Sequence, residues 1–121
     1  MEHPITWFEI PVVDIERAVK FYNAVIDGEC GEIRDGGIRK MAVLPYGMVA
    51  GGGSLVQTEG FVPGSDGIVI YLPGGDDLQV MLDRVEPAGG TITRPKARID
   101  MGYIGIFTDS EGNTVGLFSQ N

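Results

Sequence analysis

The chain of 121 residues has a formal net charge of −8, with 43% hydrophobic and 21% charged residues. This length suits one domain with a true core, and no apolar run is long enough to span a membrane. Nucleic-acid binding needs a basic surface that displaces counterions, so the acidic balance argues against a nucleic-acid partner. Acidity of this size serves solubility and, as a weak hint, favours cationic ligands.

The amino terminus and the cysteine content predict a cytoplasmic protein. The segment MEHP at residues 1–4 has neither a basic stretch nor an apolar signal core. Cys30 is the only cysteine, so no internal disulfide can form, which fits a reducing compartment. We interpret Cys30 as a small, partly buried hydrophobe rather than a reactive thiol, because no basic cluster activates it.

The first half of the chain predicts a strand, a helix and three more strands. Residues 5–12 are rich in β-branched and aromatic side chains, which favour a strand. Asp14 is then a good N-cap, and Asp27-Gly28 is a usual C-terminal signal. Apolar residues recur between them at helical spacing: Ile15, Ala18, Val19, Tyr22 and Ile26. The other strands are predicted at residues 32–34, 39–44 and 54–57.

The second half repeats this order. A strand is predicted at residues 68–72, followed by capping residues Asp76-Asp77 and a helix that Pro87 and Gly89-Gly90 end. The apolar stripe of this helix is Leu78, Met81, Leu82 and Val85. Further strands are predicted at residues 91–94, 103–108 and 114–119. The repeat offset is close to half the chain length, which indicates a tandem duplication of one βαβββ module, with modules at about 1–59 and 60–121.

Alternation along the predicted strands separates two faces, because successive side chains of a strand point to opposite sides. One set is aliphatic or aromatic and suits packing beneath helices: Phe8, Ile10, Ile68, Ile70, Leu72, Val115 and Leu117. The opposite set has mixed chemistry: Trp7, Glu9, Ser54, Gly67, Tyr71, Gly116 and Phe118. The sequence therefore predicts an α+β fold, in which a curved mixed sheet carries helices on its outer face and forms a ligand cup with the other.

Two segments carry a family resemblance that extends over nearly the whole chain. The segment VVDIERAVKFY at residues 12–22 resembles the first strand-to-helix segment of the vicinal oxygen chelate superfamily. The segment GYIGIFTDSEGNTVGL at residues 102–117 resembles its closing hairpin, with an Asp-x-x-Gly-Asn turn. This superfamily holds glyoxalase I, the fosfomycin and bleomycin resistance proteins and the extradiol dioxygenases. The two motifs imply the superfamily but no particular activity within it.

The resemblance also marks four positions for metal ligands. In metal-dependent members, His, Glu or Gln side chains from the first and last strands of each module converge in the cup. Carried over residue by residue, these positions fall on Trp7, Ser54, Gly67 and Gly116. Indole offers only an N–H donor, glycine has no side chain, and serine is a poor neutral ligand. The expectation is a member of the fold that has lost its metal and needs no cofactor.

Few other residues offer a substitute catalytic site. We interpret His3, the only histidine, as a solvated residue near the terminus. Asp109 and Glu111 belong to the predicted hairpin turn, where Asp stabilises the turn itself. Asp76 and Asp77 are interpreted as helix-capping residues. A metal site unrelated to that of the family remains the alternative.

The mixed face supplies the candidate ligand contacts, namely Trp7, Glu9, Ser54, Tyr71 and Phe118. A carboxylate at Glu9 can bind a cationic group or, as a weak candidate for catalysis, act as a general base. An acid wetted at a strand end explains the same residue equally well. The three aromatic residues can stack on a planar ligand, fill the pocket or form a dimer interface.

The segment RPKAR at residues 94–98 concentrates positive charge in an acidic chain. It is predicted as a solvated loop that borders the cup, with contact to an anionic substrate as the alternative.

Two hypotheses for function follow. The leading one is a metal-independent small-molecule-binding protein of the glyoxalase and bleomycin-resistance type, which binds an apolar or cationic ligand and pairs as a homodimer. The alternative is a glyoxalase-like lyase, isomerase or dioxygenase-type enzyme that uses a non-standard site. Metal dependence separates the two.

Overall fold

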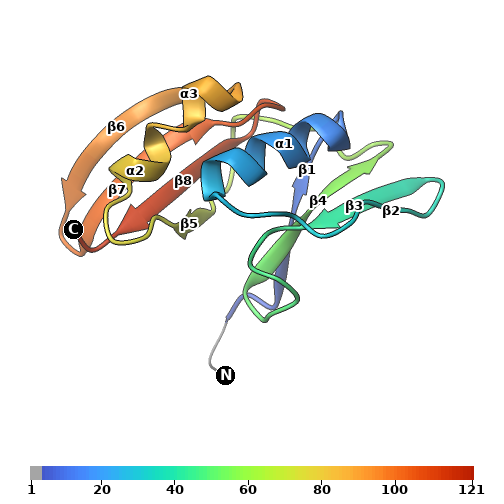
Figure 1. Ribbon diagram of the computed structural model, residues 1–121, viewed down its shortest axis with the longest axis horizontal. Helices are drawn as coiled ribbons and strands as arrows, with labels where there is room; N and C mark the ends of the chain where they lie inside the picture. The colour runs from blue at the N-terminus through green and yellow to red at the C-terminus, as the bar shows by residue number, and fades with distance from the viewer. Residues whose placement is uncertain (1–3) are drawn as a thin grey trace. The chain divides into compact units, whose positions relative to one another are not determined.

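The computed structural model describes residues 4–121, so His3 lies outside the described residues. The chain forms two compact units, one ending at Pro63 and the other comprising Gly64–Asn121 (Figure 1). Each unit contains one four-stranded mixed sheet. Within residues 4–121, every helix is too short or too polar to cross a membrane.

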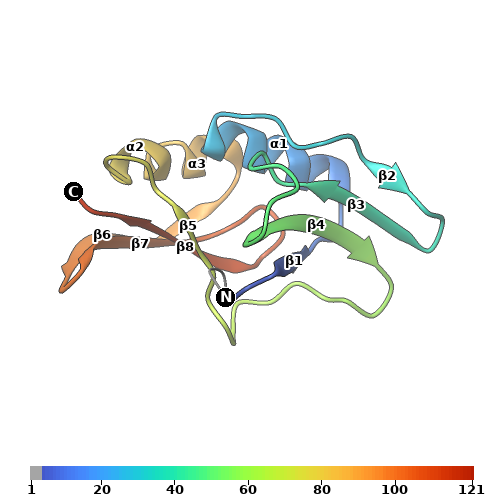
Figure 2. The same ribbon diagram turned by 90° about the horizontal axis from the view of Figure 1, so that it is seen from below.

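Unit 1, the part of the chain up to Pro63, has the strand order β1-β4-β3-β2. Its elements are β1 (Trp7–Pro11), α1 (Ile15–Ile26), β2 (Arg34–Asp35), β3 (Arg39–Val43) and β4 (Gly52–Thr58). Strand β1 runs parallel to β4, and the other neighbours are antiparallel. Helix α1 lies along one face of this sheet (Figure 2).

Helix α1 has the predicted start and end. Asp14 has an extended backbone, and its Oδ1 accepts a hydrogen bond from the N–H of Arg17 at 3.1 Å. Asp27 ends the helix with a left-handed φ of 59°. The buried residues are Ile15, Ala18, Phe21, Tyr22 and Val25. Val19 and Ile26, both predicted for this stripe, are only half-buried.

Unit 2, Gly64–Asn121, has the strand order β5-β8-β7-β6. Its elements are β5 (Tyr71–Pro73), α2 (Gln79–Leu82), α3 (Val85–Ala88), β6 (Thr91–Ile99), β7 (Gly102–Thr108) and β8 (Thr114–Ser119). Strand β5 runs parallel to β8. The helical segment packs closely on the sheet, since a Cβ added at Gly105 would lie 2.7 Å from Leu82 Cδ1.

The second predicted helix is in fact two short ones. Its apolar stripe, Leu78 to Val85, is buried as predicted, but the chain turns between Leu82 and Val85. Pro87 does not end the helix. It lies in the first turn of α3, where its missing N–H has no helical partner to lose. Gly89, with φ of 108°, ends α3.

The strand predicted at residues 68–72 is shorter, because its partner ends. Strand β5 pairs with β8 from Tyr71 opposite Gly116. Continuing that parallel register backwards would set Ile68 opposite Asn113, which belongs to the turn before β8. Ile68 is 93% exposed instead of buried, so its assignment to the helix-covered face was wrong.

Residues 94–98 form part of strand β6 and not a loop. Strand β6 pairs with β7 from Thr91 to Ile99, and the register shifts twice, between Ile92 and Arg94 and between Arg94 and Ala97. Pro95 has no N–H for a ladder and is accommodated at the second irregularity. The remaining predicted strands differ from the structure by a few residues at their ends.

In both units, a side chain of the last strand accepts a hydrogen bond from an N–H group at the start of the helical segment. The N–H of Ile15 donates to Oε1 of Gln57 in β4 at 2.8 Å, and the N–H of Leu78 donates to Oγ of Ser119 in β8 at 3.0 Å. Gln57 and Ser119 are equivalent residues of the last strand of each module. The α+β class and the βαβββ order of both modules are confirmed.

Candidate functional site

We use the term uncovered face for the side of each sheet opposite the side that packs under the helices. In unit 1, Ile10, Ala42 and Leu55 share a register row and are buried. Strand alternation therefore places Trp7, Glu9 and Ser54 on the opposite side, where Glu9 lies directly beside Ser54. The structure thus brings together the three candidate residues of unit 1.

Trp7 and Ser54 are hydrogen-bonded to each other. The indole Nε1–H of Trp7 donates to Oγ of Ser54 over 3.2 Å. Ser54 is fully buried, and Trp7 is half-buried. This bond satisfies the single polar group of the indole and orients its ring on the uncovered face.

Glu9 forms an ion pair with Arg39 across the sheet. The Arg39 guanidinium donates from Nη2 to Oε2 of Glu9, and both side chains remain about two-fifths exposed. Arg39 belongs to β3, and β4 lies between β3 and β1. Sequence reasoning missed Arg39, because only the strand order reveals that it reaches Glu9.

In unit 2, Tyr71 and Phe118 share the uncovered face. Tyr71 pairs with Gly116, and Pro73 pairs with Phe118. The ring of Tyr71 covers Gly116 so closely that any Cβ there would overlap the ring. Tyr71 is nevertheless 45% exposed, and Phe118 is half-buried, so both rings offer surface to a ligand.

The positions that the resemblance marks for metal ligands do not fit a metal ion. Trp7 and Ser54 are bonded to each other, and Tyr71 occupies the space over Gly116. Gly67 has a left-handed φ of 103° in a bend that precedes β5, outside the strands. Within residues 4–121, no three His, Cys, Asp or Glu residues gather to hold an ion.

Two partly buried side chains of unit 1, Cys30 and Tyr46, hold their protons more tightly than usual. Burial raises the pKa of the Cys30 thiol to about 11, although a backbone hydrogen bond opposes the shift. Burial likewise raises the pKa of Tyr46 to about 12. The hydroxyl of Tyr46 is buried and has no hydrogen-bond partner among the described residues. A protonated thiol is a weak nucleophile, which supports the interpretation of Cys30 as a small hydrophobe.

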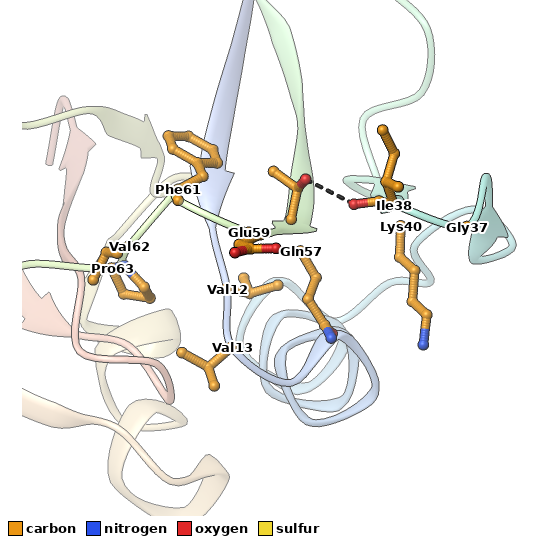
Figure 3. Close-up of a pocket in the computed structure, with 12 residues that line it drawn as sticks. Val12, Val13, Gly37, Ile38, Lys40, Gln57, Glu59, Phe61, Val62 and Pro63 are labelled. Atoms are coloured by element: carbon orange, nitrogen blue, oxygen red, sulfur yellow. Dashed lines mark hydrogen bonds between the residues drawn. The ribbon is translucent and has the colours of Figure 1, made fainter.

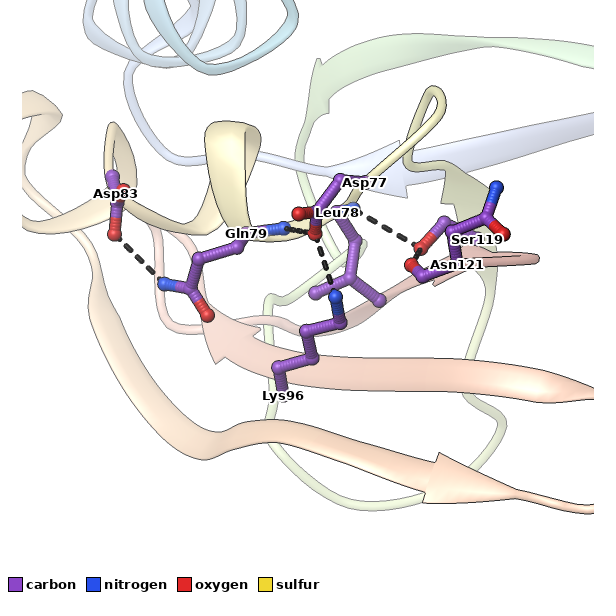
Figure 4. A network of polar contacts seen from close by, with 7 residues as sticks. All are labelled: Asp77, Leu78, Gln79, Asp83, Lys96, Ser119 and Asn121. Carbon is purple, nitrogen blue, oxygen red and sulfur yellow. Dashed lines mark hydrogen bonds and ion pairs between the residues drawn. The ribbon is translucent and has the colours of Figure 1, made fainter.

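A polar network ties β6 to the start of α2 (Figure 4). Lys96 Nζ lies 2.8 Å from Asp77 Oδ1 and 4.5 Å from the ring centroid of Tyr103. The hydrogen bond from Lys96, with a second from the N–H of Gln79, lowers the pKa of Asp77. Because Lys96 is engaged by Asp77 and Tyr103, the basic residues of segment 94–98 do not form one cationic cluster.

A groove of about 370 Å³ opens at the end of the unit 1 sheet, beside the start of α1 (Figure 3). Its apolar wall includes Val13, Val62 and Ile38, of which Ile38 is 89% exposed. Lys40 and Glu59 contribute opposite charges to the lining. None of the predicted ligand contacts lines this groove, and the sequence carried no signal for it, because the chain after β4 must turn back to form it.

The chain belongs to the Glyoxalase/Bleomycin resistance protein/Dioxygenase superfamily, whose family model matches residues 4–117. This confirms the predicted resemblance. No curated protein sequence matches the chain significantly.

Several solved structures share the fold. TnmS3, described as an antibiotic binding protein from Streptomyces sp. CB03234, is 22% identical with a TM-score of 0.67, and the match covers 100% of this chain and 98% of that one. A glyoxylase/bleomycin resistance protein/dioxygenase domain from Frankia sp. EAN1pec is 21% identical with a TM-score of 0.68, over 100% and 97% of the two chains. Glyoxalase I from Zea mays is 20% identical with a TM-score of 0.70, and this chain covers 45% of it. At these identities the likeness concerns the fold alone.

Proposed function

We propose that this protein binds an apolar or cationic small molecule on the uncovered faces of its sheets, without a metal. The proposal rests on the residues found at the positions where metal-dependent relatives are expected to carry their metal ligands. The bond between Trp7 and Ser54 and the ring of Tyr71 over Gly116 occupy positions where metal-dependent relatives are expected to carry ligands. These residues leave aromatic surface in place of a metal centre.

The aromatic residues support an apolar, planar ligand. Trp7 in unit 1 and Tyr71 and Phe118 in unit 2 lie on uncovered faces and remain partly exposed. A flat ligand that covers partly exposed rings removes apolar surface from water. This burial stabilises the complex by about 25 cal/mol per Å² of apolar surface. The description of TnmS3 as an antibiotic binding protein agrees with a binding role for this fold.

A cationic ligand has to compete for Glu9. The Arg39 guanidinium already neutralises this carboxylate, so a ligand cation must displace Arg39 before it gains the interaction. A general-base role for Glu9, which the enzyme hypothesis requires, needs the same release. The ion pair therefore opposes both cation binding and general-base catalysis at Glu9, and it leaves apolar contact with Trp7 as the favoured interaction of this face. We further propose that the protein acts in the cytoplasm as a homodimer, as expected for this fold.

Metal dependence is the first test. Chelator-treated protein is examined by thermal shift with Zn²⁺, Ni²⁺, Mn²⁺, Mg²⁺ and Fe²⁺, and untreated protein by elemental analysis. We expect unchanged midpoints and no stoichiometric metal. A metal that binds only the folded state raises the midpoint by mass action, so a clear shift with a stoichiometric ion would reverse the proposal.

A further inference from the structure

The uncovered face of unit 2 has a single charged residue among its paired strand positions. Cross-strand pairing sets Tyr71, Gly116, Ile106 and Arg94 in one row across β5, β8, β7 and β6. The neighbouring row contains Pro73, Phe118, Ile104 and Ala97. Within the described strands of this unit, Arg94 is thus the one formal charge whose pairing places it on this face.

Arg94 differs from the other cations of β6. It is exposed, and no carboxylate of residues 4–121 forms an ion pair with it. Lys96, by contrast, is held by Asp77 and Tyr103. Arg98 lies opposite Tyr103 in the register of β6 and β7. Tyr103 and Ile106 point to opposite faces of β7, so Arg98 lies on the face opposite that of Arg94. The cation of Arg94 is therefore available on the same face as the exposed ring of Tyr71 and the half-buried ring of Phe118.

We infer that the uncovered face of unit 2 binds a planar apolar molecule that carries an anionic group, with its rings on Tyr71 and Phe118 and its anion at Arg94. This inference rests on the proposed function for the aromatic contacts and goes beyond it, since it assigns a negative charge to the ligand of this face. Neighbouring strands are about 4.8 Å apart, so three spacings separate Tyr71 from Arg94 by about 14 Å. A two-ring molecule with one acidic group, met by the long arginine side chain, spans that distance.

Local charge decides the preference for an anion. The whole chain is acidic at −8 and repels anions at long range, but salt screens exposed charges beyond about 10 Å. Within that distance the guanidinium of Arg94 offers a planar fork that suits a carboxylate. The aliphatic residues Ile104 and Ile106 beside it displace water and strengthen the attraction.

Three naphthalene probes of similar size and different charge test this inference by isothermal titration calorimetry: 2-naphthoate, 2-naphthamide and 2-naphthylmethylammonium. We expect the anion to bind tightest, by about fivefold over the amide, as for an exposed ion pair. In Arg94→Gln the anion should lose about fivefold in affinity, while the amide keeps its own. Arg98→Gln is the matched control on the other face of the same strand, and it should change neither.

Each other outcome has a distinct meaning. Equal binding of anion and amide overturns the inference and leaves the proposed function standing. Tightest binding of the ammonium probe overturns the inference in favour of a cationic ligand. If none of the three probes binds, the inference and the proposal of an apolar aromatic site both fail. The ranking on the unchanged protein decides these cases even if Arg94→Gln is poorly folded. An unchanged affinity of the anion in a folded Arg94→Gln variant overturns the assignment to Arg94.

Discussion

The uncovered face of unit 1 satisfies its polar groups internally. The Trp7 N–H bonds to Ser54, and Glu9 is paired with Arg39. A buried polar group that loses its partner costs about 1–3 kcal/mol, so a ligand that leaves the Trp7–Ser54 bond intact is favoured. Contact with the flat surface of the indole preserves that bond. At the scale of single residues, this face therefore selects apolar contact.

Gly116 is required by the ring that covers it. We expect Gly116→Ala to destabilise the protein by about 1–3 kcal/mol, because the new Cβ overlaps the ring of Tyr71 and forces it to move. Urea unfolding measures the loss. Gly64→Ala is the control, since a Cβ there meets no atom within 4 Å, and it should be close to neutral.

The combination with Tyr71→Ala separates this cause from a general intolerance of the strand. If the ring is the obstacle, Gly116→Ala should cost less in a Tyr71→Ala background than alone. Additive losses in the double variant would show that Gly116 is needed for another reason.

The start of each helical segment depends on the last strand of its own module. A helix leaves its first N–H groups without helical partners. Gln57 accepts from Ile15 in unit 1, and Ser119 accepts from Leu78 in unit 2. Since both contacts join sheet to helix across about 40 residues of chain, each module is closed by a side chain rather than by the backbone alone.

Loss of either acceptor should therefore weaken the protein. We expect Gln57→Ala and Ser119→Ala each to lower the free energy of unfolding by about 1–2 kcal/mol, as loss of a helix cap does. Gln57→Glu keeps an acceptor at a helix N-terminus, where negative charge is favourable, and should retain most of the stability. Chemical denaturation gives all three values. Equal losses for Gln57→Ala and Gln57→Glu would contradict a capping role.

At the level of elements, the sequence predicted those features that depend on neighbouring residues. Asp14 and Asp27 bound α1 as expected, because caps act through the adjacent turn. The start of β5 was not predictable, because Ile68 lies opposite the turn that precedes β8, more than 40 residues later in the sequence. Residues 94–98 were predicted as a loop, yet they pair with β7 as part of β6, where an irregularity in the register accommodates Pro95.

The candidate site shows the same limit. Alternation correctly placed Trp7, Glu9 and Ser54 on one face, because side-chain direction repeats every two residues. Arg39 and Arg94 acquired their importance from strand order and pairing, which join segments far apart in the sequence. The neighbouring residues in the sequence do not indicate whether such an arginine forms an ion pair or which carboxylate would be its partner.

Across the whole molecule, the two modules share a plan and differ in surface chemistry. Each pairs an aromatic residue with a glycine of its last strand, but Phe8 covers Gly53 on the helix side in unit 1, whereas Tyr71 covers Gly116 on the uncovered side in unit 2. The uncovered face holds an ion pair in unit 1 and a single cation in unit 2. The duplication thus provides two surfaces of different chemistry from one topology.

Alkaline conditions should destabilise the protein through unit 1. The pKa values of Cys30 and Tyr46 are raised from 9.0 and 10.0 to about 11 and about 12. The folded state holds these protons more tightly than the unfolded state, so their contribution is complete below pH 9 and is lost as pH rises towards 12. Urea unfolding between pH 8 and pH 11 measures the fall in stability.

The variant Cys30→Ala/Tyr46→Phe provides the comparison, because it separates these two groups from every other effect of alkaline pH. We expect its stability to fall less steeply with pH than that of the unchanged protein. Parallel curves for the two proteins would show that burial of these groups does not govern alkaline stability.

The dependence of each helix on its last strand also bears on biosynthesis. Gln57 follows Ile15 by 42 residues, and Ser119 follows Leu78 by 41. A ribosome therefore completes the sheet and the helix contact of the first module before it has made most of the second, and the helix contact of the second module forms only after Ser119 has emerged. This order of contacts along the chain permits folding during translation one sheet at a time, which would limit the exposure of unpaired strand edges to other nascent chains.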